Sequence, residues 1–395
     1  MVVKKGYKQT NVGVIPEDWE SVRLGSIASF KSGIGIEVSK LDSDSSHANI
    51  PVFGGNGIAG YTTRSMVSES TLVIGRVGQK CGEVYLTNGP AWITDNALFP
   101  RALSGKVIIK YLAIALRGAG LNSFKNRNDL PLVTQTILDN VTITLPPTLA
   151  EQEAIASVLS DADAWIESLE QLIVKKRQIK QGAMQELLTG KRRLPGFSGK
   201  WETKRLGDVV LTDPENLSAD TSPDYAFNYV SLDDVDCGRL RSHTEQVFSS
   251  APSRARRKLR YNDVMVSTVR PNLRSHLLFK IERGEWICST GFCVLRCQYS
   301  KTHPFFVLSH FFADPLNRQI ETLLTGSSYP AINSLDIKAL EMPIPPYLEQ
   351  TAIATVLSDM DTEIESLESK LAKAREIKQG MMQELLTGRI RLIEN

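Results

Sequence analysis

The chain is poor in cysteine and has no long hydrophobic run. Its 395 residues include 5 cysteines, none in a C-x-x-C pair, which suits a reducing compartment better than a disulfide framework. The N-terminal stretch MVVKKGYKQTNVG lacks the apolar core of a signal peptide. The longest apolar helical stretch, around 112–116, is far too short to span a bilayer. We therefore expect a cytoplasmic protein with no membrane segment.

Motifs of nucleotide chemistry are also missing. No G-x-x-x-x-G-K-[ST] loop occurs, and GNGIAG at 55–60 matches G-x-G-x-x-G without the helix that a dinucleotide site needs after it. IPPY at 344–347 resembles the [D/N]PPY motif of amino-methyltransferases, but Ile344 cannot accept the hydrogen bonds that a polar first residue accepts. We interpret GNGIAG as a surface loop and IPPY as a strand-to-helix junction, and we expect no active site.

Three cysteines, Cys288, Cys293 and Cys297, lie close together in the sequence. A structural zinc site normally takes two pairs of Cys or His ligands, and no second pair accompanies these three. The stretch WICSTGFCVLRC alternates as strands do. We therefore favour three small residues on strands and expect no metal site.

What the sequence does contain is a long internal repeat. QGAMQELLTG at 181–190 returns as QGMMQELLTG at 379–388, and 30 of 44 positions are identical between 151–194 and 349–392. Each copy follows a Pro-Pro pair, and proline is favoured at the first turn of a helix. Both copies therefore predict a helix.

Apolar residues recur within each copy at steps of four and three, which is typical of a coiled-coil helix. The expected seam consists of Ile155, Leu159, Ala162, Ile166, Leu169 and Ile173 in the first copy, and Ile353, Leu357, Met360, Ile364, Leu367 and Leu371 in the second. Gly190 and Gly388 follow as expected C-terminal caps. Each helix would have about 38 residues and a length of roughly 57 Å. Because a single amphipathic helix exposes its seam, we expect the copies to pack against each other, most simply antiparallel.

A second, weaker repeat opens the two remaining segments: DWESVRLGSIA at 18–28 resembles KWETKRLGDVV at 200–210. STLVIGRVG and NDVMVSTVR alternate like strands, VIIKYLAIALRG has helical spacing, and Asn88-Gly89 predicts a hairpin turn. We predict an α+β fold built as a tandem repeat with a pseudo-two-fold axis. Strand-rich globules occupy 1–148 and 195–346, and long helices occupy 149–194 and 347–395.

The net charge of +2 is uninformative, but basic residues gather within both globules. RARRKLR at 254–260 places five basic side chains in seven positions. Such residues neutralise phosphates, and Arg and Asn can read base edges. The candidate DNA-binding residues are Lys31, Asn56, Tyr61, Arg64, Arg76 and Lys80 in the first globule, and Arg254, Arg256, Arg257, Lys258, Arg260, Arg270 and Arg274 in the second. The alternative is a solvated face that binds nothing.

These features together resemble the specificity subunit of type I restriction–modification systems. The similarity covers essentially the whole chain and lies in YKQTNVGVIPEDWESVRLG, PVFGGNGIAGY, STVRPNLR, PPYLEQTAIATVLSDMD and the two QELLTG endings. Its most specific parts are the two E-Q-x-A-I-A-x-V-L-S-D helices and the order globule, helix, globule, helix.

The resemblance implies two target-recognition domains, each reading one half of a bipartite, asymmetric site in double-stranded DNA. The two helices would set the spacing of the half-sites and dock two copies of a methyltransferase subunit, so that one sequence is needed twice. The chain itself would hold no catalytic residue and no cofactor. S-adenosylmethionine would be bound by the adenine-specific methyltransferase, and ATP and Mg²⁺ by a motor–nuclease subunit where the system also restricts.

Three alternative hypotheses for the function remain from the sequence alone. A coiled-coil scaffold would bind proteins through its globules instead of DNA. An autonomous methyltransferase would need the cofactor loop that the sequence lacks. A modification-only system would use the same specificity subunit without a nuclease.

The expected spacer helices predict a molecular ruler. Inserting four residues near Lys175 or Lys373 should lengthen the gap between the half-sites or abolish binding, because each residue extends a helix by about 1.5 Å. Selection of bound sequences from random DNA measures that gap. An unchanged gap would contradict the ruler.

Overall fold

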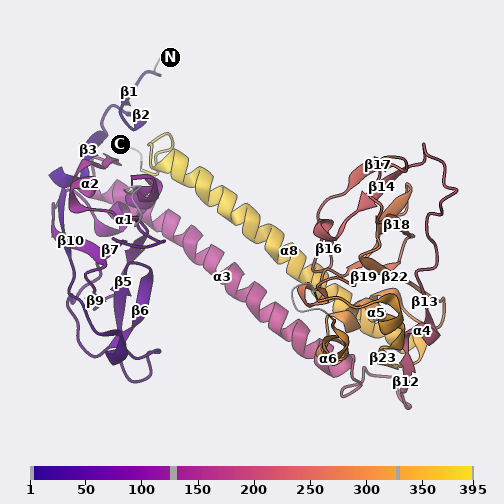
Figure 1. Cartoon of the computed structure of the whole chain (residues 1–395). Coiled ribbons are helices and arrows are strands. Elements are labelled where there is room, and N and C mark those ends of the chain that lie inside the picture. Colours follow the sequence, from indigo (N-terminus) through magenta and orange to yellow (C-terminus); the bar gives the residue numbers. More distant parts are fainter. Residues whose placement is uncertain (1–3, 125–130, 326–329, 394–395) are drawn as a thin grey trace. The chain divides into compact units, whose positions relative to one another are not determined.

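The fold comes from a computed structural model that describes residues 4–124, 131–325 and 330–393. The chain forms two compact units: unit 1 is Met1–Glu170 with Ser369–Asn395, and unit 2 is Gln171–Glu368. The chain has two long helices, α3 (Leu149–Leu187) and α8 (Tyr347–Leu385) (Figure 1). Each of them is divided between the two units. Globule 1 is the part of unit 1 before α3, and globule 2 is the part of unit 2 between α3 and α8. Each unit therefore combines one globule with the beginning of one long helix and the end of the other.

Both globules are built on the same frame. In globule 1, β3 (Glu20–Arg23) pairs antiparallel with β11 (Thr142–Leu145), the strand that leads into α3. In globule 2, β12 (Glu202–Arg205) pairs in the same way with β23 (Glu341–Ile344), which leads into α8. The weak sequence repeat around DWESVRLG and KWETKRLG is therefore a repeat of this structural frame.

Besides short two-stranded sheets, each globule contains two larger sheets, and the strand orders of these larger sheets correspond. The first is four-stranded in both globules, with the orders β4-β10-β7-β8 and β13-β22-β19-β20. The further sheet has three strands in globule 1, β6-β5-β9, and four in globule 2, β17-β14-β21-β18. One pair in each further sheet is parallel, β5 with β9 and β14 with β21.

The remaining elements of globule 1 are β1 (Tyr7–Thr10), β2 (Gly13–Pro16), η1 (Leu24–Ser26), β4 (Ala28–Ser32), η2 (Val38–Lys40), β5 (Ile50–Gly54), β6 (Gly57–Thr62), β7 (Leu72–Gly75), β8 (Val84–Leu86), β9 (Trp92–Ile93), β10 (Ala97–Leu103), α1 (Ile109–Gly118), η3 (Leu121–Phe124) and α2 (Gln135–Asn140). Those of globule 2 are α4 (Leu206–Val209), β13 (Val210–Thr212), β14 (Ala226–Val230), η4 (Leu232–Asp234), β15 (Val235–Asp236), β16 (Arg239–Leu240), β17 (Thr244–Val247), β18 (Ala255–Lys258), β19 (Val264–Ser267), η5 (Pro271–Leu273), β20 (Leu277–Leu278), β21 (Trp286–Ser289), β22 (Phe292–Cys297), α5 (Pro304–Phe311), α6 (Asp314–Leu323) and α7 (Ser334–Ala339).

The predicted α+β class is confirmed, but one turn was interpreted wrongly. The chain bends at Asn88-Gly89, where Gly89 has a φ of 106°. Its flanking strands do not pair with each other, because β8 pairs with β7 and β9 pairs with β5. The bend therefore passes the chain from one sheet to the next. GNGIAG forms the β5–β6 hairpin with no helix after it, and IPPY lies at the junction of β23 and α8.

The two long helices pack antiparallel within each unit. In unit 2, Arg177 pairs with Glu368 at 2.6 Å and Lys180 with Asp361, so partners descend along α8 as they ascend along α3. Unit 1 repeats this geometry 198 positions further on, with Arg375 at 2.5 Å from Glu170 and Lys378 beside Asp163. These pairs flank the seam: Ile155, Leu159, Leu169, Ile173, Ile353, Leu357, Ile364 and Leu367 are buried, and Ala162, Ile166, Met360 and Leu371 are half-buried.

A buried glutamine joins the first turn of each long helix to its globule. Gln350 is fully buried, and its Oε1 accepts the N–H of His303 at 2.9 Å. Its Nε2 donates to the carbonyls of Lys301 and Pro345, both at 2.9 Å. Gln152 makes the equivalent three bonds in unit 1. Because every donor and acceptor is matched, the joint fixes where each helix leaves its globule.

A buried carboxylate beside that glutamine holds the end of the other helix. In unit 2, Arg193, which follows α3, forms a two-bond ion pair with Glu349 at 2.5 and 2.6 Å, and its guanidinium lies 5.3 Å from the ring of Trp201. In unit 1, Arg391, which follows α8, pairs in the same way with Glu151. Buried two-bond pairs of this kind lock geometry strongly, because loss of one partner leaves a buried charge.

The helix ends also agree with the sequence. Gly190 and Gly388 adopt φ values of 70° and 67°, and Arg192 N–H and Arg389 N–H donate back to Glu186 and Glu384, as the predicted C-terminal caps require. Within residues 4–124, 131–325 and 330–393, none of the helices combines the length and the apolar character needed to cross a membrane.

The glutamine joint yields a stability prediction. Gln350→Ala should lower the free energy of unfolding of unit 2 by about 2–3 kcal/mol, because buried polar groups lose their partners. Urea denaturation measures this change, and Gln152→Ala should act similarly on unit 1. Gln181→Ala, at an exposed glutamine of α3, is the matched control and should stay within about 0.5 kcal/mol. Equal effects of Gln350→Ala and Gln181→Ala would contradict the proposed joint.

Candidate DNA interface

Four of the candidates in globule 1 gather at one end of its four-stranded sheet. Lys31 lies near the end of β4, with its Nζ 4.9 Å from the ring centroid of Phe99. Arg76 directly follows β7 and donates from Nη1 to Ser32 Oγ at 3.0 Å, and Lys80 lies further along the β7–β8 loop. Asn56 forms the tip of the β5–β6 turn. The side chains of Lys31, Asn56 and Lys80 are exposed, and Arg76 is half-buried.

Glycines allow the β5–β6 turn and the β7–β8 loop to approach so closely. A Cβ on Gly55 would lie 2.6 Å from the carbonyl oxygen of Val77, and one on Gly75 would lie 2.4 Å from that of Gly55. Both distances are far below a normal contact, so larger residues would push the two segments apart. The glycines of GNGIAG therefore position a loop tip rather than a cofactor.

Tyr61 and Arg64 lie apart from that group, at the opposite end of the β5–β6 hairpin. Tyr61 pairs through its backbone with Asp42, and Arg64 is exposed with its guanidinium 5.5 Å from the ring of Trp92. The structure thus divides the first set of candidates into two places.

In globule 2, part of the RARRKLR run forms an outward basic and aromatic surface. The guanidinium of Arg256 lies 5.0 Å from the ring centroid of Phe248, and the ammonium of Lys258 lies 5.7 Å from that of Tyr225. Arg254 is exposed just before β18. Cations held over aromatic rings remain available for phosphate, because an aromatic ring does not neutralise their charge.

Arg257 points the other way. Its side chain is only 16% exposed, and its Nη1 lies 2.5 Å from Asp213 Oδ2. Asp213 is further held by Ser334 Oγ at 2.6 Å and by the backbone N–H of Val294 at 2.8 Å. Arg257 lies between Arg256 and Lys258 on β18, and successive side chains of a strand point to opposite faces. Arg257 therefore stabilises the globule, and its charge is already matched.

Arg260 is exposed, but it forms an ion pair with Glu215. Its Nη2 lies 2.7 Å from Glu215, which also contacts Arg296 at 2.5 Å. Burial opposes ionisation of Glu215, yet the two guanidinium groups outweigh it and lower the pKa of this carboxyl group below its ordinary value. The charge of Arg260 is thus partly used within the fold.

Arg270 and Arg274 flank η5 in the β19–β20 loop, and both side chains are exposed. Both have left-handed backbones, with φ values of 48° and 55°. The buried imidazole of His276 joins the two ends of this loop, since its Nδ1 accepts the N–H of Ser267 at 3.1 Å. Burial, and secondarily Arg274, lowers the pKa of His276 to about 3, so this imidazole is neutral at physiological pH. Such strained loops often serve function.

The β7–β8 and β19–β20 loops correspond, because β7 and β19 occupy the same place in matching sheets. Each loop also forms a β-bridge to the segment before the last short helix of its globule: Val77 pairs with Leu132 before α2, and Val269 pairs with Ala331 before α7. Arg76 with Lys80, and Arg270 with Arg274, are therefore basic residues of equivalent loops. The sequence shows each pair but not their equivalence, since the two loops share little sequence.

Sequence reasoning missed the residues that join each globule to the helices. They are Gln152 and Gln350, Glu151 and Glu349, Arg193 and Arg391, and also Arg117 and Arg239. The first six are identical between the two copies of the repeat, and that identity outside the seam was the available signal. Nothing in the sequence marks Arg117 or Arg239.

The three clustered thiols are poor metal ligands. Cys288 and Cys293 are fully buried. Burial raises the pKa of Cys288 well above its usual range and that of Cys293 and Cys297 to about 12. The thiolate form that binds metals is therefore disfavoured at each of them. Within the described part of the chain, no group of three His, Cys, Asp or Glu residues is arranged to hold a metal ion.

Comparisons with known proteins agree with this architecture. A family model for the type I restriction modification DNA specificity domain matches the chain twice, over 16–179 and 198–376. The type I restriction enzyme MjaVIII specificity subunit of Methanocaldococcus jannaschii is 23% identical over 428 residues, covering 99% of both chains. An S subunit of a type I restriction–modification system from M. genitalium superposes with a TM-score of 0.66 at 16% identity, covering 96% of this chain and 98% of that one. A chain from a study of complex assembly and conformational transition of the type I R-M system gives a TM-score of 0.51 at 18% identity, covering 95% and 99%.

Because the two matches cover most of its residues, the chain belongs to the type I restriction–modification DNA specificity family. Each match spans one globule and much of the long helix that follows it. The predicted family and fold are confirmed, and nothing in these comparisons favours a coiled-coil scaffold that binds proteins alone.

The opposite orientations of Arg256 and Arg257 give a paired prediction. The variant Arg256→Ala/Lys258→Ala should weaken DNA binding and lower the salt slope of the binding constant by about 1 for each phosphate contact removed. Titration of labelled duplex DNA at several salt concentrations measures both.

Arg257→Ala is the neighbouring control. It should lower the free energy of unfolding by about 3 kcal/mol, because it leaves Asp213 unpaired. The assignment would be wrong if the double variant lost stability with unchanged DNA affinity.

Proposed function

We propose that this chain selects the DNA sequence on which a type I restriction–modification complex acts, with each globule reading one half of a bipartite site in double-stranded DNA. The observation that carries the proposal is a repeated frame with different loops. Globules 1 and 2 share the β3–β11 and β12–β23 pairing and the same order in their four-stranded sheets. Their basic loops differ in sequence and shape, as reading two unlike half-sites requires.

The proposed DNA contacts are exposed or half-buried candidates, which are basic except for Asn56 and Tyr61. They are Lys31, Asn56, Tyr61, Arg64, Arg76 and Lys80 in globule 1, and Arg254, Arg256, Lys258, Arg260, Arg270 and Arg274 in globule 2. Most contacts from such residues go to phosphates, and fewer read base edges. We omit Arg257 because its charge is matched by Asp213 inside the fold.

We further propose that the chain has no active site and binds no cofactor itself. Two methyltransferase subunits would supply adenine methylation with S-adenosylmethionine, and a motor–nuclease subunit would use ATP and Mg²⁺ where the system restricts. The complex would act in the cytoplasm, where the host DNA is. The lengths of α3 and α8 would set the spacing of the half-sites.

The repeated helices offer one equivalent apolar residue each for a partner that binds twice. Ile179 and Ile377 occupy matching positions of the repeat and are 47% and 45% exposed. Exposed apolar side chains in matching surroundings favour two copies of the same partner, because each unit presents the same local surface. The flanking sequence IKQG is identical in both copies.

Two matched substitutions test this docking. Ile179→Arg and Ile377→Arg should each reduce the number of bound methyltransferase subunits from two to one, and the double variant should bind none. Native mass spectrometry of the purified complex counts the subunits. Val174→Arg, at a 52% exposed position whose repeat equivalent is Ala372, is the control and should leave two bound. Two subunits retained by the double variant would place docking elsewhere.

The proposed function itself is tested in the host. Single-molecule methylation sequencing of the genome, with and without this gene, should reveal loss of adenine methylation at one bipartite motif. The motif would give both half-sites and their gap at once. Unchanged methylation in a host that expresses the complex would contradict the proposal.

A further inference from the structure

Globule 2 carries a small hairpin that faces the long helices. Strand β15 pairs with β16 in the register Asp236 with Arg239, and Cys237 and Gly238 make the turn. Both turn residues have positive φ, 41° and 87°, as a tight two-residue hairpin turn requires.

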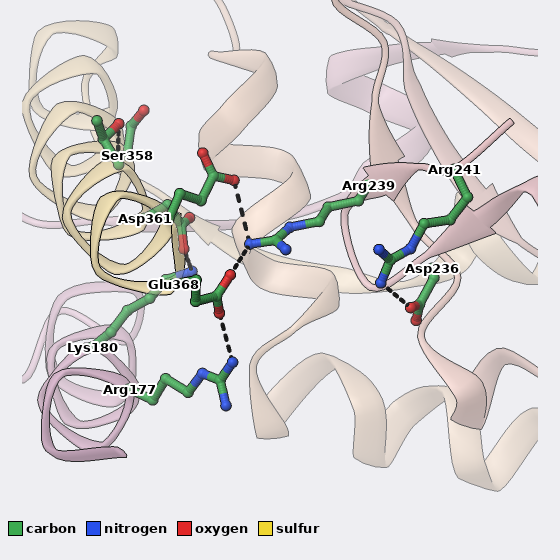
Figure 2. Close-up of polar contacts among 10 residues, drawn as sticks. Arg177, Lys180, Asp236, Arg239, Arg241, Ser358, Asp361 and Glu368 are labelled. Carbon is green, nitrogen blue, oxygen red and sulfur yellow. Dashed lines mark hydrogen bonds and ion pairs between the residues drawn. The ribbon is translucent and has the colours of Figure 1, made fainter. Parts of the chain in front are cut away.

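One side of this hairpin is tied to the long helices by an ion pair. Arg239 Nη2 lies 2.7 Å from Glu368 Oε2 and 3.7 Å from Glu365 Oε1. Glu368 Oε1 simultaneously receives Arg177 of the opposite helix at 2.6 Å. Figure 2 shows Glu368 between the two guanidinium groups, with Arg239 reaching across from the hairpin. A single carboxylate thus joins both helices to globule 2.

The turn of the same hairpin is tied to the basic β19–β20 loop. The backbone N–H of Gly238 donates to the carbonyl of His276 at 2.8 Å, and the thiol of Cys237 lies 3.8 Å from the carbonyl oxygen of Leu273. Both acceptors belong to the segment that presents Arg270 and Arg274. Arg239 and the hairpin turn therefore form one connection between α8 and the β19–β20 loop.

The two strands of the hairpin pack on the core of globule 2 through Val235 and Leu240. Its turn side borders a cavity of about 560 Å³, whose lining includes Arg239, Arg274 and Glu368. On this side the turn is held by polar contacts, namely the ion pair of Arg239 and the hydrogen bond of Gly238. Replacing Arg239 should therefore change the position of the turn while the hydrophobic core stays intact.

Globule 1 makes a comparable connection with different residues. Arg117, in the last turn of α1, lies 3.7 Å from Asp163 of α3 through Nη1. Its Nε donates to the carbonyl of Val84 at 3.0 Å, at the start of the strand that follows the β7–β8 loop. In both units, therefore, an arginine of the globule pairs with a carboxylate of a long helix. Arg117 also contacts the strand after the β7–β8 loop, and Arg239 belongs to the hairpin that contacts the β19–β20 loop.

We propose that Arg239 is a positioning residue that holds the β19–β20 loop in a fixed register on the long helices, so that the second half-site is read at one distance only. This inference rests on the proposed function. Arg239 does not contact DNA in this role and acts through the hairpin turn. Because its side chain is 43% exposed, the ion pair contributes little to folding stability.

The test is a selection of DNA by the full chain assembled with its methyltransferase partner. The library keeps the first half-site constant and randomises both the second half-site and the length of the gap. The variants are Arg239→Ala and Arg239→Lys. The control is Arg241→Ala, because Arg241 turns back to Asp236 at 2.6 Å on the same hairpin without reaching the helices (Figure 2).

The wild type should enrich one second half-site at one gap length. Arg239→Ala should reduce enrichment of the second half-site at that gap at least tenfold and accept gaps one base pair shorter or longer, with unchanged melting temperature. Arg239→Lys should restore part of the selectivity, and Arg241→Ala should match the wild type. Glu368→Gln should resemble Arg239→Ala, whereas Arg177→Ala, which breaks only the contact between helices, should not.

Two results would overturn the inference alone, and a third would overturn it together with the proposed function. An enrichment profile of Arg239→Ala equal to that of the wild type would leave Arg239 as an ordinary surface ion pair. Equal losses in Arg239→Ala and Arg241→Ala would assign the effect to the hairpin in general. A wild type that enriches no bipartite sequence would instead remove the proposed function, and this inference with it.

Discussion

The buried pairs of Glu151 with Arg391 and Glu349 with Arg193 are the contacts on which the architecture depends. Each carboxylate sits at the first turn of one long helix, and each guanidinium follows the last turn of the other. Loss of either partner would leave a buried charge uncompensated, so each pair holds the end of one helix against the start of its neighbour. The neighbouring glutamines, Gln152 and Gln350, then fix the start of each helix to its globule. The antiparallel packing of the helices agrees with this joint.

The duplication allows the helices to stay alike while the loops of the two globules differ. The helices and their joints are nearly identical in both copies, which suits the proposed binding of two copies of one partner. The loops on the shared frame are free to differ, because β3–β11 and β12–β23 hold each globule whatever its loops contain. Globule 2 uses this freedom for the β15–β16 hairpin and a fourth strand in its second sheet, beyond the three-stranded sheet of globule 1.

Features set by local periodicity could be predicted from the sequence. The heptad positions gave the buried or half-buried seam, and glycines at 190 and 388 form helix caps because few other residues adopt a positive φ easily. The family was also recognisable, since its helix motifs are long and specific. Alternation along β18 separates Arg257 from Arg256 and Lys258, but which of the two faces is inward was not predictable. It depends on the partner Asp213, which is 44 positions away in the sequence. Likewise Arg239 and Glu368 are separated by 129 positions, so no sequence pattern joins them.

The composition of unit 1 has a consequence for the order of folding during synthesis. Its core includes Leu385, with Met381 and Met382 packed against it, and Arg391 also contacts Asp18 at 3.1 Å. The globule that leaves the ribosome first therefore lacks part of its core until the last residues are made. Unit 2 is contiguous in sequence, from 171 to 368, and can close earlier. Although domains usually complete folding from the N-terminus onward, here the later globule is the first to have all its contacts.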